Sequence, residues 1–311
     1  MHQLLAPPIH ELERLVSGDH HDPHSILGIH EAKDGRKLVR GYHPDAEECV
    51  LIDADGAETS MFPLGDGLFG TLIESAPATF HYSLRFRFSS GETWERQDPY
   101  SFLPTLGEQD LYLFGEGTHR RLTDAFGARV IEVDGVKGTA FSVWAPNARR
   151  ASVVGDFCSW DGRLFPMRSL GSSGVWEIFL PGVSPGAFYK YELRAQNGDL
   201  RLKVDPVGQC MEMPPGQSSI VHDSEFIWSD DEWMTQREGR DHLCSPINIY
   251  ELHLGSWARN VEDGNRSLSY REIAPRLASY VRDLGYTHVV YNRLRPVHWT
   301  PRKKTTKNIY T

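Results

Sequence analysis

The sequence predicts a mainly β protein in which two tandem immunoglobulin-like β-sandwiches precede a strand–helix–strand unit of a parallel sheet. Between residues 82 and 88, Tyr, Leu and Phe alternate with Ser and Arg, which is the period of a half-buried antiparallel strand. The pattern around this strand returns about 105 residues later, a spacing typical of repeated whole domains. From Ser245 onward, an apolar strand, a helical segment and a second apolar strand follow one another.

The composition is that of an acidic globular protein. The chain has 311 residues, 40% of them hydrophobic, and a net charge of −9, which allows two or three domains. An acidic chain disfavours a nucleic-acid partner, because nucleic acids bind basic surfaces. No apolar run reaches transmembrane length, and Pro7 and Pro8 break the segment where a signal peptide would lie. We therefore expect no membrane partner and a cytoplasmic location.

The cysteines and one histidine-rich segment are the candidate ligands for a metal ion. The four cysteines lie far apart without a Cys-x-x-Cys pair, so neither a zinc site nor a disulfide framework is expected. Residues 8–17 predict a short helix that Gly18 ends, and the next segment, Asp19 to His24, holds three histidines and two aspartates. Its spacing fits no standard ligand pattern, and Pro23 stiffens it into a turn. We therefore favour a structural or solvated loop and predict no metal.

Three motifs of the first β region return in the second. The matching pairs are Val39–Pro44 with Phe141–Pro146, Gly67–Phe69 with Gly174–Trp176, and Tyr82, Gly91 and Asp98-Pro99 with Tyr189, Gly198 and Asp205-Pro206. Short strands joined by Gly and Pro turns are typical of β-sandwiches. We interpret the repeat as two sandwiches of the same design.

The segment between the two copies contains Gly115-x-Gly117. Two glycines at this spacing begin a dinucleotide-binding motif, but position 120 is Arg120 and no strand–helix–strand unit follows. We therefore predict neither a phosphate-binding loop nor a cofactor.

The second copy contains a stretch that the first lacks, Gly155 to Asp161, with Trp160 inside it. Together with Lys190, this stretch resembles the glycogen-binding modules of carbohydrate-binding family 48. An exposed indole offers a flat apolar face to a glucose ring, and a lysine donates hydrogen bonds to its hydroxyls. Trp160 and Lys190 match the ligand positions of that family, so the resemblance implies that they bind α-glucan.

The alternative is that Trp160 packs against its own sandwich or a neighbouring domain. The family usually has a second tryptophan after the hairpin glycine, whereas here Gly198 is followed by Asp199, so that platform is missing. Two further tryptophans, Trp144 and Trp176, lie inside strand patterns and are expected in the core.

The last part of the chain begins with a strand. Pro246 can open it, and apolar residues with period two continue to Leu254. In the following helix, Ser269 and Glu272 fit a capping box, but Pro275 suggests that the regular helix begins near residue 275. Residues 288–291 complete the strand–helix–strand order.

Residues 250–257, Tyr-Glu-Leu-His-Leu-Gly-Ser-Trp, resemble the first barrel strand of the 1,4-α-glucan branching enzymes in the α-amylase superfamily (glycoside hydrolase family 13). Residues 284–289 resemble the second strand, and the match stops near Val290. The resemblance implies the N-terminal part of a glycogen-biosynthetic enzyme that transfers α-1,4-glucan segments to form α-1,6 branches. It also implies that residues 246–311 are the first βαβ unit of a truncated (β/α)8 barrel.

Only 66 residues run from Pro246 to Thr311, whereas a (β/α)8 barrel takes about 250. The family carries its catalytic carboxylates on later barrel strands, so the resemblance implies no catalytic residue and no branching activity in this chain. From Leu284 to Thr311 there is no Asp or Glu, which indicates a disrupted reading frame or, alternatively, a genuine basic tail. Two other readings remain open: a non-catalytic α-glucan-binding protein, and an unproductive, partly folded fragment.

These observations divide the chain into five segments, with α-glucan as the expected partner and no signal for an oligomeric state. The segments are a sandwich over 1–105, a linker over 106–128, a sandwich over 129–228, a linker over 229–245, and the barrel start over 246–311.

Overall fold

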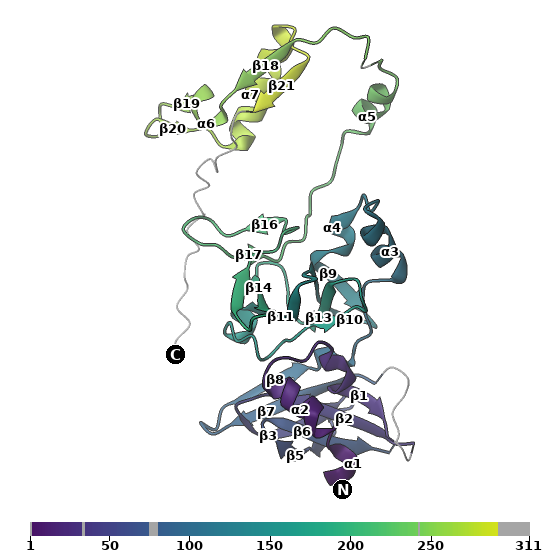
Figure 1. Cartoon of the computed structure of the whole chain (residues 1–311). Helices are drawn as coiled ribbons and strands as arrows, with labels where there is room; N and C mark the ends of the chain where they lie inside the picture. Colours follow the sequence, from purple (N-terminus) through teal and green to yellow (C-terminus); the bar gives the residue numbers. More distant parts are fainter. Residues whose placement is uncertain (1, 33–34, 75–79, 242, 292–311) are drawn as a thin grey trace. The chain divides into compact units, whose positions relative to one another are not determined.

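The computed structural model describes residues 2–32, 35–74, 80–241 and 243–291, and the basic tail from residue 292 onward lies outside them. The chain divides into two compact units, Met1–Glu225 and Phe226–Thr311 (Figure 1). The prediction of a mainly β chain with antiparallel sheets is confirmed. Within the described residues, no helix is long and apolar enough to cross a membrane.

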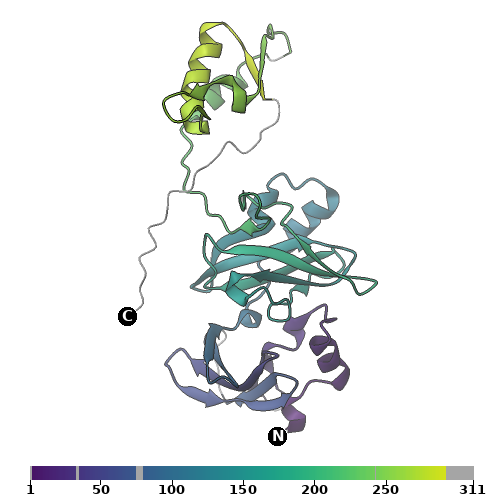
Figure 2. The same cartoon turned by 90° about the vertical axis from the view of Figure 1, so that its left-hand side faces the viewer.

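Two antiparallel four-stranded sheets form the first sandwich, drawn in purple and blue in Figures 1 and 2. One sheet has the order β1-β2-β6-β5, with β1 Gly28–Glu31, β2 Lys37–Tyr42, β6 Leu68–Ile73 and β5 Phe62–Gly65. The other has the order β4-β3-β7-β8, with β4 Glu58–Ser60, β3 Ala46–Asp53, β7 Tyr82–Phe88 and β8 Thr93–Gln97. Helices α1 (His2–Leu5), α2 (Ile9–Val16) and the 3-10 turn η1 (Pro23–Ser25) precede β1.

Strand β7 illustrates how the sequence pattern produces this sandwich. Tyr82, Leu84 and Phe86 are buried and pack against apolar residues of the opposite sheet. Arg85 lies between them and points outward, where it forms ion pairs with glutamates of β4 and β8. The two-residue period therefore separates a buried face from a solvated one.

The second sandwich repeats this architecture. One sheet has the order β12-β13-β10-β9, with β12 Arg168–Ser169, β13 Val175–Pro181, β10 Val136–Trp144 and β9 Gly127–Val133. The other has the order β11-β14-β17-β16, with β11 Ala148–Gly155, β14 Phe188–Ala195, β17 Ser219–Ile220 and β16 Cys210–Met211, and β15 Leu200–Lys203 also pairs with β14. The core between the sheets includes Phe141 and Ile178 from one, and Val153 and Tyr191 from the other.

The internal repeat is visible in two equivalent hydrogen bonds. In the first sandwich the Tyr82 hydroxyl donates to Asp98 Oδ2 over 2.6 Å, and in the second the Tyr189 hydroxyl donates to Asp205 Oδ2 over 2.6 Å. Tyr82 lies on β7, which pairs with β3, and Tyr189 lies on β14, which pairs with β11. Both aspartates are buried. The same buried tyrosine–aspartate hydrogen bond is therefore present in both sandwiches.

The segment between the sandwiches is partly helical. It contains η2 (Pro99–Ser101), α3 (Glu108–Glu116) and α4 (Leu122–Ala125). Gly115 lies inside α3, and Gly117 ends that helix in the left-handed conformation with a φ of 77°, a common role for glycine. The two glycines thus form a helix end, which explains their spacing without a phosphate.

The two sandwiches share a buried contact. The Arg96 guanidinium of the first lies 4.8 Å from the ring centroid of Trp94 and 4.7 Å from that of Phe165 in the second. The Tyr100 hydroxyl also lies 3.4 Å from the carbonyl oxygens of Leu164 and Pro166. These contacts join residues 94–100 to the segment that follows β11.

The second unit is built around two parallel strands and one helix. Its elements are α5 Asp231–Glu238, β18 Ile249–Leu252, α6 Leu254–Trp257, β19 Arg259–Asn260, β20 Arg266–Ser267, α7 Tyr270–Asp283 and β21 His288–Tyr291. β18 pairs with β21 in parallel, so the predicted strand–helix–strand order is present. Residues 231–238, within the predicted linker, form α5, which has no buried residue.

The predicted start of α7 near residue 275 is wrong. The helix begins at Tyr270, and Pro275 lies inside it. The Ser269 hydroxyl accepts a hydrogen bond from the Glu272 amide over 3.3 Å, and the Glu272 carboxylate accepts one from the Ser269 amide over 2.7 Å. This reciprocal cap satisfies donors of the first turn, and it outweighs the single hydrogen bond that the proline removes.

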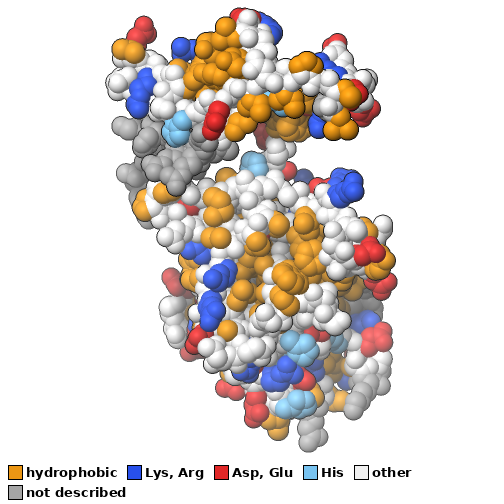
Figure 3. All heavy atoms as spheres, turned by 45° about the horizontal axis from the view of Figure 1, so that its top comes forward, with side chains coloured by type: hydrophobic (Ala, Val, Ile, Leu, Met, Phe, Trp, Pro, Cys, Tyr) orange, Lys and Arg blue, Asp and Glu red, His pale blue; other side chains and the backbone are white. Residues whose placement is uncertain are grey.

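Helix α7 covers only one face of the two-stranded sheet. Leu252 and Leu254 pack against Ile273 and Leu277 of this region and are buried. On the other face Ile249 is 54% exposed, and several neighbouring apolar residues are exposed as well. Figure 3 shows hydrophobic side chains gathered on the surface of this unit, at the top of the view.

Candidate functional site

The loop that carries Trp160 begins with a close approach of two backbones. Strand β11 ends at Gly155, where a Cβ atom would clash with the carbonyl oxygen of Phe188 on β14. Residues Asp156–Cys158 then form the 3-10 turn η3. Phe157 packs between Phe141 and Phe165, with ring centroids 6.0 and 5.9 Å away. The base of the loop is therefore anchored in the core.

Cys158 completes this base. Its side chain is buried, and its Sγ lies 3.3 Å from the Gly155 amide and 3.4 Å from the Gly155 carbonyl oxygen. Burial raises the pKa of the Cys158 thiol, although hydrogen bonds from the backbone of Gly155 and Trp160 oppose that shift. The thiol therefore acts as a neutral packing group.

The chain next takes a left-handed path. Ser159 and Trp160 have φ angles of 49° and 62°, which is uncommon for residues with a Cβ atom. The Trp160 amide donates to the Gly155 carbonyl over 2.9 Å, and the Asp161 amide donates to the Cys158 carbonyl over 3.0 Å. This turn leaves the Trp160 side chain 40% exposed.

Lys190 lies on β14 next to the strand from which this loop departs. It pairs with Val154 in the register of β11 and β14, and it alternates with the buried Tyr189 and Tyr191. Its side chain is therefore on the outer face of the sheet. Within the described residues, no hydrogen bond or ion pair engages its ammonium group.

The loop and Lys190 share this outer face. A Cβ atom at Gly162 would overlap the carboxylate of Glu192, which lies two residues beyond Lys190 and on the same face of β14. The chain after Trp160 therefore passes over this face of the sheet at Glu192. An exposed indole and an ammonium group on one surface can stack on a sugar ring and donate hydrogen bonds to its hydroxyls.

The second aromatic platform of the family is absent at its expected place. Gly198 forms the turn between β14 and β15 with a φ of 90°, and exposed Leu200 and Leu202 follow on β15. Leucines offer apolar surface but no flat ring. Of the predicted site residues, Trp160 alone therefore offers a flat aromatic face.

Two residues next to this loop, Arg163 and Asp45, were not predicted from the sequence. The Arg163 guanidinium donates to Asp161 Oδ2 over 2.6 Å and to Asp45 Oδ2 of the first sandwich over 2.9 Å. Burial alone would raise the pKa of Asp161, but the hydrogen bonds and charge of Arg163 lower it overall. The Asp161-x-Arg163 spacing is visible in the sequence, whereas nothing there indicates Asp45.

The prediction that Trp144 lies in the core is wrong, while Trp176 is buried as expected. Phe141 and Val143 point into the sandwich core, so Trp144, one position on, points outward and is 54% exposed. There it contacts Phe114 of α3, with ring centroids 6.0 Å apart.

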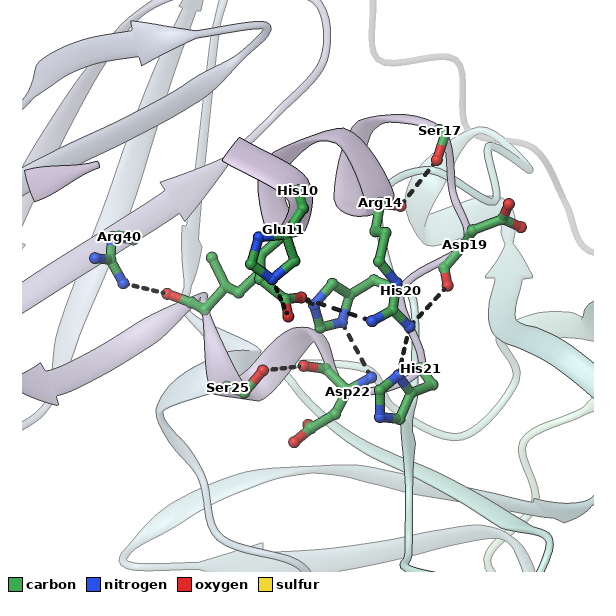
Figure 4. A network of polar contacts seen from close by, with 11 residues as sticks. His10, Glu11, Arg14, Ser17, Asp19, His20, His21, Asp22, Ser25 and Arg40 are labelled. Carbon is green, nitrogen blue, oxygen red and sulfur yellow. Dashed lines mark hydrogen bonds and ion pairs between the residues drawn. The ribbon is translucent and has the colours of Figure 1, made fainter. Parts of the chain in front are cut away.

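Two of the three histidines in the segment from Asp19 to His24, His20 and His21, contact side chains of helix α2 (Figure 4). His20 Nε2 lies 2.6 Å from Glu11 Oε2, and Arg14 Nη2 lies 2.7 Å from His21 Nδ1. Asp19 forms an ion pair with Arg149 of the second sandwich over 2.7 Å. Among the residues that the structure describes, no group of three potential ligands could hold a metal ion.

Two protein families match parts of the chain. Residues 8–100 match the alpha-1,4-glucan branching enzyme GlgB N-terminal domain, and residues 125–208 match carbohydrate-binding module 48, also described as the isoamylase N-terminal domain. The second match includes the loop with Trp160 and the strand with Lys190.

Curated relatives match nearly the whole chain. The 1,4-alpha-glucan branching enzyme GlgB of Myxococcus xanthus is 46% identical over 282 residues, which cover 90% of this chain and 38% of the relative. The enzyme of the same name from Rubrobacter xylanophilus is 49% identical over 287 residues, covering 89% of this chain and 38% of the relative. The chain therefore spans just over a third of the length of these relatives.

Among solved structures, ligand-free PulA from Klebsiella pneumoniae superposes with a TM-score of 0.39 and 17% identity. The superposition covers 81% of this chain and 28% of that chain.

Proposed function

We propose that the chain is the N-terminal part of a 1,4-alpha-glucan branching enzyme with a family 48 carbohydrate-binding module. From this premise, its second sandwich binds α-glucan through Trp160 and Lys190. The observation that carries this proposal is the exposed indole of Trp160 on a loop that the first sandwich lacks. Indoles that are both exposed and held rigidly are typical of sugar-stacking surfaces, because the ring face is apolar and its position is fixed before binding.

Lys190 supplies the polar part of the proposed site. An ammonium group donates up to three hydrogen bonds and accepts none, which suits the hydroxyl oxygens of a glucose ring. Its place on the same outer face as the Trp160 loop supports a joint role. The net charge of −9 is compatible with this ligand, since α-glucan is uncharged.

Residues 246–291 are proposed to be the first βαβ unit of the (β/α)8 barrel of a branching enzyme. The parallel pairing of β18 with β21 and the helix between them support this assignment. We likewise propose boundaries between domains near residues 105, 128, 228 and 245, and a cytoplasmic location.

The 311-residue chain by itself is proposed to form no branches. Retaining transfer between sugars needs a carboxylate nucleophile and a carboxylic acid/base close together, and branching enzymes carry these on later barrel strands. Within the described residues, the parallel strands of this region are β18 and β21, which would be the first two of such a barrel. Branch formation is checked by incubating the purified chain with amylose and counting new α-1,6 linkages. Protein-dependent linkages above background would overturn this part of the proposal.

Glucan binding is tested by affinity electrophoresis in gels with increasing glycogen. We expect the wild-type chain to be retarded, and Trp160→Ala to bind about tenfold more weakly, given the size of aromatic contacts. Trp144→Ala is the matched control, because it removes an exposed indole from the other sheet of the same sandwich. Equal retardation of the wild type and Trp160→Ala would mean that Trp160 does not contribute to glucan binding. No retardation of the wild type would mean that the chain has no glucan site.

A further inference from the structure

We propose that the first sandwich holds the Trp160 indole in place through an ion triad of Asp45, Arg163 and Asp161, so that Asp45 is a positioning residue of the glucan site. This inference rests on the proposed function and adds to it a role for the N-terminal domain. Asp45 and Arg163 are 118 residues apart in the sequence and belong to different sandwiches.

The conformation of the loop calls for external support. Ser159 and Trp160 both occupy the left-handed region, and such residues persist only when contacts on both sides over-determine their backbone. The N-terminal side is anchored by Phe157 and Cys158 in the core. The C-terminal side begins at Asp161, whose side chain turns toward Arg163.

Arg163 connects that side of the loop to the first sandwich. Asp161 Oδ1 accepts a hydrogen bond from the Arg163 amide over 2.9 Å, and both Asp161 carboxylate oxygens accept from Arg163 Nε over 3.1 and 3.0 Å. Arg163 Nη2 then donates both to Asp161 Oδ2 and to Asp45 Oδ2. A single planar guanidinium thus fixes the two carboxylates relative to each other.

Asp45 is itself held by a rigid part of the first sandwich. Its amide lies 3.2 Å from Nδ1 of His43, and the His43 amide donates to the Gly67 carbonyl over 3.0 Å. The His43 ring is buried and contacts Phe86 and Trp94, with ring centroids 5.4 and 5.5 Å away. The position of Asp45 is therefore set by the core of the first sandwich.

A second contact keeps the two sandwiches in register near the loop. The buried Tyr100 hydroxyl meets the carbonyl oxygens of Leu164 and Pro166, one to three residues beyond Arg163. The Tyr100 contacts therefore already hold residues 164–166 close to the first sandwich. The ion pair of Asp45 with Arg163 then needs to set only the orientation of the loop.

The size of the effect follows from exposure. The side chains of Arg163, Asp45 and Asp161 are 50%, 59% and 26% exposed, and exposed ion pairs contribute little individually. Loss of Asp45 should therefore weaken glucan binding by a few-fold and leave the fold intact. Because α-glucan is uncharged, any dependence of its affinity on salt must arise from charges within the protein, which salt screens.

Affinity electrophoresis in glycogen gels tests the inference on the full chain at low and high KCl. The variants are Asp45→Ala, the conservative Asp45→Glu, Trp160→Ala, and Asp55→Ala as the matched control. Asp55 is another exposed carboxylate of the first sandwich, and within the described residues its side chain makes no hydrogen bond or ion pair. Thermal unfolding of each variant shows whether the fold is retained.

We expect Asp45→Ala to raise the dissociation constant about three- to fivefold at low salt, with Asp55→Ala unchanged and Asp45→Glu largely restored. The affinity of the wild type should fall with KCl, and that of Asp45→Ala should fall less, because only the Arg163–Asp161 pair of the triad then remains to be screened. If Asp45→Ala binds like the wild type while Trp160→Ala is weakened, the inference is wrong and the proposed function stands. If Trp160→Ala binds like the wild type, the proposed function fails and the inference with it.

Discussion

The sheet of β11 and β14 and the sheet of β18 and β21 differ in how many of their faces are covered. In the second sandwich, Tyr189 and Tyr191 of β14 pack into the core, and the outer face carries the buried ion pair of Arg150 with Glu192 beneath the loop that holds Gly162. In residues 246–291, α7 covers one face only, and Ile249 and Val290 remain exposed on the other.

This difference shows that a region with a specific sequence motif can still have a small core. Residues 250–257 carry the most specific motif in the chain, yet they belong to the region with the smaller core. The second sandwich carries a weaker motif, but its two sheets bury a shared core that can hold an indole at a fixed place. A parallel sheet normally requires cover on both faces, so residues 246–291 are expected to be the less stable region.

The largest expected difference concerns proteolysis. Trypsin should cut at Arg240 and Arg259, both exposed, at least about tenfold faster than at any site among the described residues of the two sandwiches, because local opening of a small core requires little free energy. Intact-mass analysis of a digestion time course identifies the first products. If a fragment that contains residues 246–291 lasts as long as the two sandwiches, residues 246–291 are not the less stable region.

Core substitutions in the two regions should act on separate transitions. Ile178 is fully buried in the second sandwich, and Ile178→Ala should lower the free energy of unfolding of the first unit by about 2–5 kcal/mol. Leu277→Ala, in the core of residues 246–291, should leave that transition unchanged. Urea unfolding followed by tryptophan fluorescence measures both. A comparable shift from Leu277→Ala would mean that the two units unfold together.

Acid should destabilise the first unit through buried histidines, whereas His253 and His288 of the second unit are exposed. Burial, together with the nearby charge of Arg96, lowers the pKa of His43 to about 4. The unfolded chain then binds the proton more tightly, so the free energy of unfolding falls as the pH drops from about 6.5 to about 4, by up to about 3 kcal/mol.

This acid effect is measured by urea unfolding between pH 7 and pH 4. His43→Asn retains a side-chain acceptor for the Asp45 amide and removes the titration. The variant should show a shallower dependence of stability on pH than the wild type. The same slope in both proteins would exclude His43 as the source.

The smallest expected effect is the difference in stability loss between substitutions of the two equivalent tyrosines, Tyr82 and Tyr189. Tyr82→Phe and Tyr189→Phe each remove a donor from a buried aspartate, at a cost of about 1–3 kcal/mol. Asp205 keeps the Tyr191 hydroxyl at 3.4 Å, so Tyr189→Phe should cost less than Tyr82→Phe. Thermal unfolding measures the two shifts, and a larger loss from Tyr189→Phe would contradict this order.

Local sequence patterns predicted most of the fold. The alternation at Tyr82, Leu84 and Phe86 identified β7, and the repeated Tyr and Asp positions identified the equivalent strands of the second copy. Both signals are short in sequence, and each is a direct consequence of strand geometry. The same alternation, applied from Phe141, would also have placed Trp144 outside the core.

The surroundings of the candidate site could be predicted only in part. Trp160 and Lys190 lie within the second copy and follow from its resemblance to a known module. Asp45 lies in the first sandwich and meets Arg163 only because the two domains pack together, and no periodicity in the sequence encodes that contact. The start of α7 was misplaced for a different reason, since the balance between the Ser269 cap and Pro275 depends on energies rather than on pattern.

The uneven burial of the four cysteines makes the chain suited to spectroscopy. Cys49 and Cys158 are buried, and burial raises the pKa of both thiols, that of Cys49 to about 12, so neither forms the thiolate that reacts with a maleimide. Cys244 is exposed between α5 and β18, and Cys210 is partly covered. A Cys210→Ser variant would therefore carry one natural attachment point for a spin label. The line shape of that label would report directly how freely the segment between the sandwiches and the parallel strands moves.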